Sequence, residues 1–177
     1  MRILVVNAGS SSLKLRVLDG DDAVVRTSDL GPVDELGAAG IATAVEALGP
    51  VDAVGHRVVH GGSRFTSPVL LDDNVVAALR DLAQLAPLHQ PPGLAAIDAV
   101  GRVLPDTPAV ACFDTAFHAS LPAAAATYAV PRPWRDELGV RRYGFHGLSH
   151  AYASRRASGL MGRPCPTGLP SPIPRAE

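Results

Sequence analysis

Three observations predict that this sequence folds as a mixed α/β domain. Unbroken apolar runs at residues 3–6 and 109–113 are typical of strands that are buried on both faces of a sheet. Between these runs, apolar residues recur at helical spacing over residues 34–48, 73–85 and 93–104. Polar residues follow directly where the strands end, which is where α/β domains place their functional sites.

The first strand leads into a turn that has no bulky side chain. Residues 7–12 read Asn-Ala-Gly-Ser-Ser-Ser, so backbone N–H groups and hydroxyls can approach an anion closely, and Gly9 permits a turn with positive φ. Residues 13–17 then alternate apolar and charged side chains, which predicts a second strand with one buried face. The pattern fits a phosphate-binding hairpin, but it also fits an ordinary hairpin with a serine-rich turn.

The ends of the predicted helices are marked by local signals. Gly49-Pro50 ends the first helix, and Asp72 or Asp73 can N-cap the second. We expect the prolines of residues 86–92 to fix an extended loop before the third helix begins at Gly93.

The C-terminal third of the sequence is irregular from Ala116 onward. Ser149 can cap a helix that begins at His150, and residues 1–161 are expected to form one domain. Residues 162–177 contain five prolines and no apolar periodicity, so we expect a disordered and aberrant tail.

Composition limits the classes of partner and compartment. A hydrophobic content of 47% with a formal net charge of -1 gives no electrostatic reason to expect nucleic acid. No run is long enough for a membrane span, and two cysteines provide neither a disulfide set nor a zinc pattern. A globular protein of the reducing cytoplasm fits these features.

Two charged residues stand where buried strands end. Arg57 precedes a glycine turn, and arginine suits bidentate contact with a carboxylate or phosphate, although a surface ion pair is the alternative. Asp114 follows the run 109–113, where a carboxylate can hold Mg²⁺ or steer a nucleophile; its alternative role is a turn or helix cap.

Histidines provide further candidates. His146 and His150 have i, i+4 spacing, but the glutamate of a zinc-binding HExxH motif is absent, which disfavours zinc. Between Phe145 and Gly147, His146 better suits a donor to a phosphoryl oxygen, and His89 could act in the same way. His56 and His60 are weaker candidates that could serve only to hydrogen-bond their loop.

Five segments together resemble one family. They are VVNAGSSSLK, VGHRVVHGG, APLHQPPGL, FDTAFHASLP and RRYGFHGLSH, and they are similar to segments of the acetate kinase family at corresponding positions over residues 1–157. The resemblance implies an actin-like (ribonuclease H-like) ATPase domain, a mixed sheet with flanking helices, and a second domain missing from this chain. It also implies Mg²⁺-assisted phosphoryl transfer between ATP and acetate, with ADP and acetyl phosphate as products.

The resemblance also assigns roles to individual residues. Asn7 resembles the Mg²⁺-associated residue, and Lys14 resembles a nucleotide-phosphate contact together with Ser10 and Ser12. Arg57 resembles the acetate-binding arginine, Asp114 the catalytic aspartate and His146 the transition-state stabiliser. His89 resembles a further phosphoryl contact, and the pocket for the acetate methyl group corresponds to Val59, Leu88 and Phe145. The sequence departs from the family pattern at Gln90-Pro91-Pro92-Gly93, where Asn-Pro-Ala-Asn is usual, and at Leu148, where threonine is common.

Two alternatives stay open at this point. A propionate or butyrate kinase of the same fold is a close competitor, because one methylene in an apolar pocket is worth only about 1–3 kcal/mol. A non-catalytic fragment that binds phosphate or nucleotide is the other. The resemblance implies a homodimer formed mainly through the second domain. Phosphoryl transfer needs one lobe to close on the other, so we expect the chain without that second lobe to have little or no kinase activity alone. The tail would be a frameshift product if a shift of the reading frame after Gly162 restored a second domain.

Overall fold

Six strands form one sheet, and the predicted mixed α/β architecture is confirmed. The computed structural model describes residues 1–162. The strands lie in the order β3-β2-β1-β4-β6-β5. Their bounds are β1 (Ile3–Ala8), β2 (Leu13–Leu18), β3 (Val24–Leu30), β4 (Ala53–Val58), β5 (Val69–Leu70) and β6 (Ala109–Phe113).

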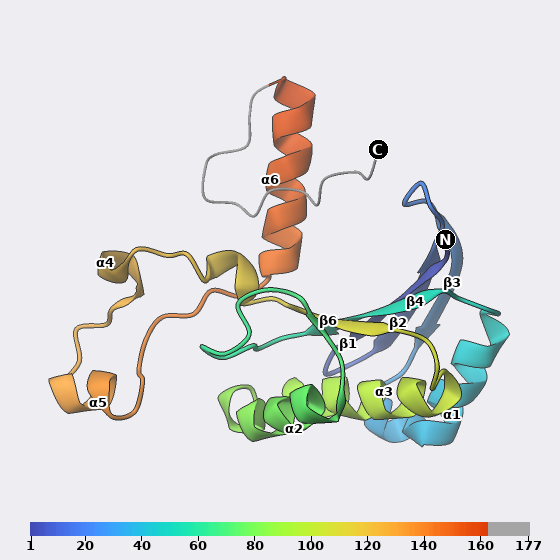
Figure 1. The fold of residues 1–177 in the computed structure, drawn as a ribbon, viewed down its shortest axis with the longest axis horizontal. Coiled ribbons are helices and arrows are strands. Elements are labelled where there is room, and N and C mark those ends of the chain that lie inside the picture. The colour runs from blue at the N-terminus through green and yellow to red at the C-terminus, as the bar shows by residue number, and fades with distance from the viewer. Residues whose placement is uncertain (163–177) are drawn as a thin grey trace.

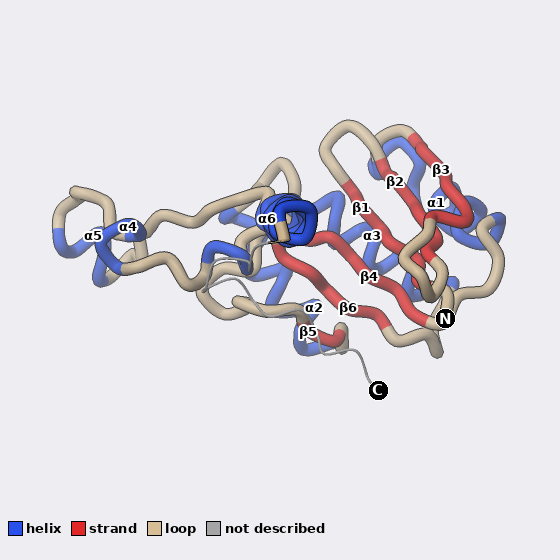
Figure 2. The backbone as a smooth tube through the Cα atoms, turned by 90° about the horizontal axis from the view of Figure 1, so that it is seen from above, coloured by secondary structure: helices blue, strands red, loops and turns tan. Residues whose placement is uncertain are grey.

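The central strands run parallel and the outer ones antiparallel. β1 pairs in parallel with β4, and β4 with β6, whereas β2, β3 and β5 pair with their neighbours in the antiparallel sense. The carboxyl ends of β1, β4 and β6 therefore meet at one edge of the sheet, as seen from above in Figure 2. This edge is where Asn7, Arg57 and Asp114 lie.

Three helices cover one face of the sheet (Figure 1). They are α1 (Val33–Ala47), α2 (Asp73–Asp81) and α3 (Gln90–Val103). Alternate strand residues point at them, and the resulting core contains Leu4 and Val6 of β1 together with Ile41 of α1 and Val100 of α3. A second cluster joins Phe113 of β6 to α2 and α3. Burial of one residue in two along β1, β2 and β4 thus fixes which side chains remain for the other face.

The remaining helices are short except the last. They are the 3₁₀ helices η1 (Leu82–Leu85) and η2 (Ala116–His118), then α4 (Ala123–Ala126), α5 (Arg132–Asp136) and α6 (Gly147–Met161). The helix α6 rises from the carboxyl end of β6 on the side of the sheet opposite α1–α3, and the segment with α4 and α5 extends away from the sheet (Figure 1). Within residues 1–162, no helix is long and apolar enough to cross a membrane.

Helix boundaries follow the predictions in part. The carboxylate of Asp72 accepts a hydrogen bond of 2.7 Å from the amide of Val75, so the predicted cap of α2 is confirmed. The third helix begins at Gln90 instead of Gly93, because Pro91 and Pro92 occupy the first turn, where a missing N–H costs nothing. The prediction of an extended loop over residues 86–92 is therefore wrong for residues 90–92.

Two further local expectations are wrong. The helix expected from His150 begins at Gly147, and its N-cap is His146, not Ser149. Gly9 is not among the glycines with positive φ; its amide donates to the carbonyl of Ser12, which closes the turn without that conformation. The tail predicted for residues 162–177 lies, after Gly162, outside the described residues.

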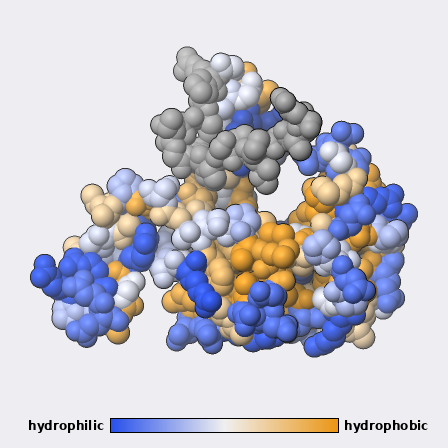
Figure 3. All heavy atoms as spheres, in the orientation of Figure 1, coloured by the Kyte–Doolittle hydropathy of each residue, from blue (hydrophilic) through white to orange (hydrophobic). Residues whose placement is uncertain are grey.

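Hydrophobic side chains also gather on the outside of the molecule. In the view of Figure 1, they cover the middle of the surface, between hydrophilic groups along the bottom and at both ends (Figure 3). Leu70 of β5 is one exposed hydrophobic residue, with 61% of its surface accessible.

Candidate functional site

A row of side chains crosses the sheet on the face that α1–α3 leave uncovered. Lys14 of β2 is the register partner of Asn7 of β1, Asn7 is that of Arg57 of β4, and Arg57 is that of Cys112 of β6. The neighbours of these residues along each strand are buried toward the helices, so the four side chains share the opposite face. Three of the four are predicted site residues.

Arg57 is the centre of this row. Its Nη2 and Nε donate to one carboxylate oxygen of Asp114, at 2.6 Å and 3.1 Å, and its Nη1 donates to Oδ1 of Asn7 at 2.9 Å. The side chain of Asp114 is only 3% exposed and that of Arg57 is 25% exposed. The ion pair considered for Arg57 therefore exists, but its partner is a second predicted site residue at the end of the neighbouring strand.

His60 ties three segments together beside this edge. It is buried, and its Nδ1 accepts a hydrogen bond of 2.8 Å from the amide of Gly62, so the neutral ring carries its proton on Nε2. Burial also lowers the pKa of His60. The side chain of Gln90 bonds both the amide and the carbonyl of His60, and the rings of Tyr143 and Phe145 pack edge-on against it, with centroids 4.6 Å and 5.6 Å away.

The loop before α6 docks on the end of β6. The amide of Gly147 donates to the carbonyl of Asp114 at 2.9 Å, and Nε2 of His118 lies 3.1 Å from the carbonyl of Phe145. A Cβ on Gly147 would collide with that Asp114 carbonyl oxygen, so only glycine permits this approach. His146, between Phe145 and Gly147, has a left-handed backbone with φ 55°. The docked loop thus holds the backbone of His146 next to Asp114.

The other predicted residues lie around this centre with fewer contacts. Lys14 and Ser10 are exposed and Ser12 is half-buried, beside the carboxyl end of β1. His89 immediately precedes α3 and is exposed. Within residues 1–162, the rings of His89 and His146 make no hydrogen bond.

The three residues assigned to a methyl pocket are not equally placed. Val59 directly precedes His60, whose ring contacts Phe145, so these two predicted residues lie near one another. Leu88 is 74% exposed and lines, with Pro87 and Pro91, a hollow between α1 and α3. The structure therefore gives Leu88 a different set of neighbours from Phe145.

Oxygen ligands for a metal ion are few but suitable. Residues 1–162 contain no group of three or more His, Cys, Asp and Glu that could hold a metal. The amide oxygen of Asn7 and the carboxylate of Asp114 both lie around the Arg57 guanidinium. One carboxylate and one amide suit Mg²⁺, which commonly keeps waters and takes further oxygens from substrate phosphates.

Four supporting residues were not predicted as part of the site. Gln90 and Thr115 are buried; Gln90 holds His60, and the hydroxyl of Thr115 accepts from the amide of Gly61 at 3.0 Å. Gly144 and Gly147 permit the close approach of the loop to His118 and Asp114. Among these four residues, the sequence singled out only Gln90, because it stands at a position where the family usually has a different residue.

Comparison with known proteins identifies relatives over nearly the whole chain. The model of the acetokinase family matches residues 33–167. The acetate kinase of Deinococcus radiodurans is 43% identical over 197 aligned residues, which cover 94% of this chain and 49% of the relative. The chain spans about half the length of the curated relatives it matches.

Solved structures agree with this assignment. The acetate kinase of Porphyromonas gingivalis is 31% identical, with a TM-score of 0.80 over 92% of this chain and 49% of that protein. A propionate kinase from Francisella tularensis is 30% identical, with a TM-score of 0.77 over the same shares of the two chains.

Proposed function

Because this chain belongs to the acetokinase family, we propose that its uncovered sheet face is one half of a site for phosphoryl transfer between ATP and acetate. The observation that carries the proposal is the contact of Arg57 with both Asn7 and Asp114 at the carboxyl edge of parallel strands. Three residues far apart in the sequence meet there, on a face that α1–α3 leave free for a ligand.

Arg57 can bind an anion without leaving its partners. A guanidinium has five N–H donors, and three of them are engaged by Asp114 and Asn7. One N–H on Nη1 and one on Nη2 are left, and such a pair suits the two oxygens of a carboxylate. Asp114 and Asn7 then act as positioning residues that orient this fork toward the substrate.

Acetate needs no general base in this reaction. A simple carboxylic acid has a pKa close to that of glutamate, about 4.3, so it is already ionised at neutral pH. The difficulty is to bring two anions together, and positive groups reduce their repulsion. We assign Arg57 to the carboxylate, the exposed Lys14 to a nucleotide phosphate and His146 to a transferring oxygen.

A magnesium ion would be held by Asp114 and Asn7 together with phosphate oxygens and water. Bound there, it would neutralise charge on the nucleotide phosphates. Ser10 and Ser12, in the turn after β1, would contact those phosphates through hydroxyls and backbone amides.

Propionate is a second candidate substrate, favoured by the match to the propionate kinase of Francisella tularensis. Phe145 is 43% exposed, so the described residues do not enclose a pocket that would separate the two acids. The ratio of kcat/KM for acetate and propionate decides between them.

The experiment pairs binding with turnover. We expect calorimetric titration of the 177-residue chain to detect acetyl phosphate and ATP, and hydroxamate trapping to find turnover far below that of the Deinococcus radiodurans relative. The reason is that Arg57 and Phe145 remain open to water, whereas phosphoryl transfer needs a closed and oriented site. Absence of binding by both ligands contradicts the proposal. Turnover equal to that of the relative contradicts the claim that this sheet face is only one half of the site.

A further inference from the structure

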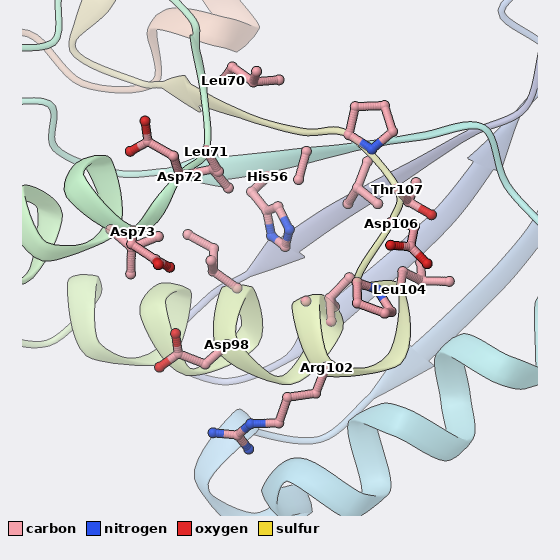
Figure 4. A pocket seen from close by; sticks show the side chains of 18 of the residues that line it. His56, Leu70, Leu71, Asp72, Asp73, Asp98, Arg102, Leu104, Asp106 and Thr107 are labelled. Atoms are coloured by element: carbon pink, nitrogen blue, oxygen red, sulfur yellow. The ribbon is translucent and has the colours of Figure 1, made fainter.

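A cavity lies on the other side of the sheet from Arg57. It has a volume of about 680 Å³ and is bounded by β4, by the segment from β5 into α2, by α3 and by residues 104–109 (Figure 4). This size is within the range of pockets that hold small organic molecules.

His56 of β4 projects into this cavity. The residue is only 2% exposed, and Figure 4 shows its ring directed into the space above α3. Within residues 1–162 the ring makes no hydrogen bond. Burial lowers the pKa of His56 to about 4, so the ring is neutral near pH 7 and offers one donor and one acceptor. No buried side-chain nitrogen or oxygen of the described residues lacks a partner, so the ring nitrogens of His56 are accessible from the cavity, where a ligand would take the place of water.

The walls around His56 are apolar. They are formed by Leu71, Val76, Ile97, Val100, Leu104 and Ala109. A ligand that reaches the imidazole must therefore present an apolar body to the wall and one polar atom to the ring.

The mouth of the cavity is acidic. Four aspartates line it, against two arginines. Of the aspartates, Asp98 is paired with Arg80 at 2.8 Å and Asp72 caps α2. The carboxylates of Asp73 and Asp106 have no ion-pair or hydrogen-bond partner in the described part of the chain, and in Figure 4 they lie on opposite sides of His56. The side chain of Arg102 points away from the ring in the same view.

We propose that this cavity binds a small organic amine. The ammonium group lies at the mouth with Asp73, the apolar body lies against Ile97 and Leu104, and a hydroxyl or similar group hydrogen-bonds the imidazole of His56. The residues of this cavity have no role in the phosphoryl-transfer proposal, so each of the two proposals can fail without affecting the other.

The position of His56 separates this site from Arg57. The two residues are consecutive in β4, and successive side chains of a strand leave opposite faces of the sheet. His56 faces α3, and Arg57 faces the uncovered side with Asn7 and Asp114. An amine in the cavity therefore does not occupy the space of an anionic substrate.

Titration of the full 177-residue chain with tyramine tests the proposal. Tyramine has an ammonium group, an aromatic body and a phenolic hydroxyl. We expect ¹H–¹⁵N spectra to shift at His56, Gly101 and Ala109, which line the cavity. Phenethylamine, which lacks the hydroxyl, should bind about fivefold more weakly. 4-Hydroxyphenylacetate, which carries a carboxylate in place of the ammonium, should not bind.

Variants distinguish this site from non-specific attraction. His56→Leu and Asp73→Asn should each weaken tyramine binding about fivefold, and Asp21→Asn, an exposed carboxylate in the turn after β2, should not change it. Asp73 is exposed, so its variant tests the site even if the substitution of His56 disturbs folding. Absence of shifts at about 5 mM tyramine, equal binding of the carboxylate analogue, or unchanged affinity of Asp73→Asn overturns the proposal.

Discussion

Arg57 and Asp114 form an ion pair in which two guanidinium N–H groups donate to the same carboxylate oxygen, at 2.6 Å and 3.1 Å. The two residues end neighbouring parallel strands, and the carboxylate is almost completely buried. Removal of the arginine therefore leaves a buried charge without its counter-ion, which is more costly than loss of a surface pair.

Arg57→Leu should lower the free energy of unfolding by about 2 kcal/mol, because Asp114 loses its counter-ion and Asn7 loses a donor. Arg80→Leu is the matched control, since the Arg80–Asp98 pair has side chains that are 52% and 36% exposed; it should cost below about 1 kcal/mol. Urea unfolding measures both. An equal decrease in the free energy of unfolding for the two variants would show that burial of Asp114 does not make the Arg57–Asp114 pair more stabilising than the exposed pair.

Gly147→Ala should destabilise the protein by about 2 kcal/mol, because the new methyl group meets the Asp114 carbonyl and Cβ of Phe117, which would be 2.7 Å away. Gly159→Ala in the same helix has no atom within 4 Å of its new Cβ and should stabilise α6 by up to about 1 kcal/mol. Thermal unfolding of the pair gives the comparison. A tolerated Gly147→Ala would mean that the loop of His146 is not held against β6.

Gln90→Ala should cost about 2 kcal/mol, because the amide and carbonyl of His60 both lose their side-chain partner in a buried site. Gln84→Ala removes the same side chain from an exposed position in η1 and should have an effect below about 0.5 kcal/mol. The near-ultraviolet circular dichroism of Tyr143 and Phe145 should change only in Gln90→Ala. If both variants unfold at the same urea concentration, His60 does not depend on Gln90.

Stability should fall as the pH is lowered through the range of histidine titration. Burial lowers the pKa of His56 from its ordinary 6.5 to about 4, so the unfolded chain binds a proton before the folded one does. The contribution of neutral His56 to the free energy of unfolding is complete above about pH 6.5 and is lost toward pH 4. The loss amounts to about 2 kcal/mol between about pH 7 and pH 5. Burial of His60 acts in the same direction.

His56→Leu is the control for this pH effect. The variant removes the titrating group and should flatten the dependence of the unfolding free energy on pH over the same interval. A slope as steep as that of the unchanged protein would assign the effect to other groups.

Local patterns predicted most of the elements. The strand at residues 109–113 and the cap at Asp72 are confirmed, because each depends on neighbours within a few positions. The start of α3 was wrong because the proline-rich loop rule competes with the preference of proline for the first helical turn. The actin-like domain implied by the resemblance is confirmed by the matches to solved acetate and propionate kinases.

Contacts between distant segments could not be predicted from these patterns. The sequence predicted that Arg57 and Asp114 lie at strand ends. It could not predict that the two residues are neighbours, because local periodicity does not determine the strand order. The hydrogen bonds of Gln90 to His60, and the approach of Gly147 to Asp114, require the folded positions of two segments at once. Leu88 shows the same limit, since its neighbours in α1 are determined by helix packing.

The most direct test of the substrate site is a titration of the isotope-labelled 177-residue chain with acetyl phosphate, beside the Arg57→Leu variant. We expect the resonances of Asn7, Asp114 and Gly147 to shift together, and the shifts to disappear in Arg57→Leu but persist in Arg80→Leu. Shifts confined to other parts of the molecule, or equal affinity of the Arg57→Leu variant, would contradict a substrate site at Arg57.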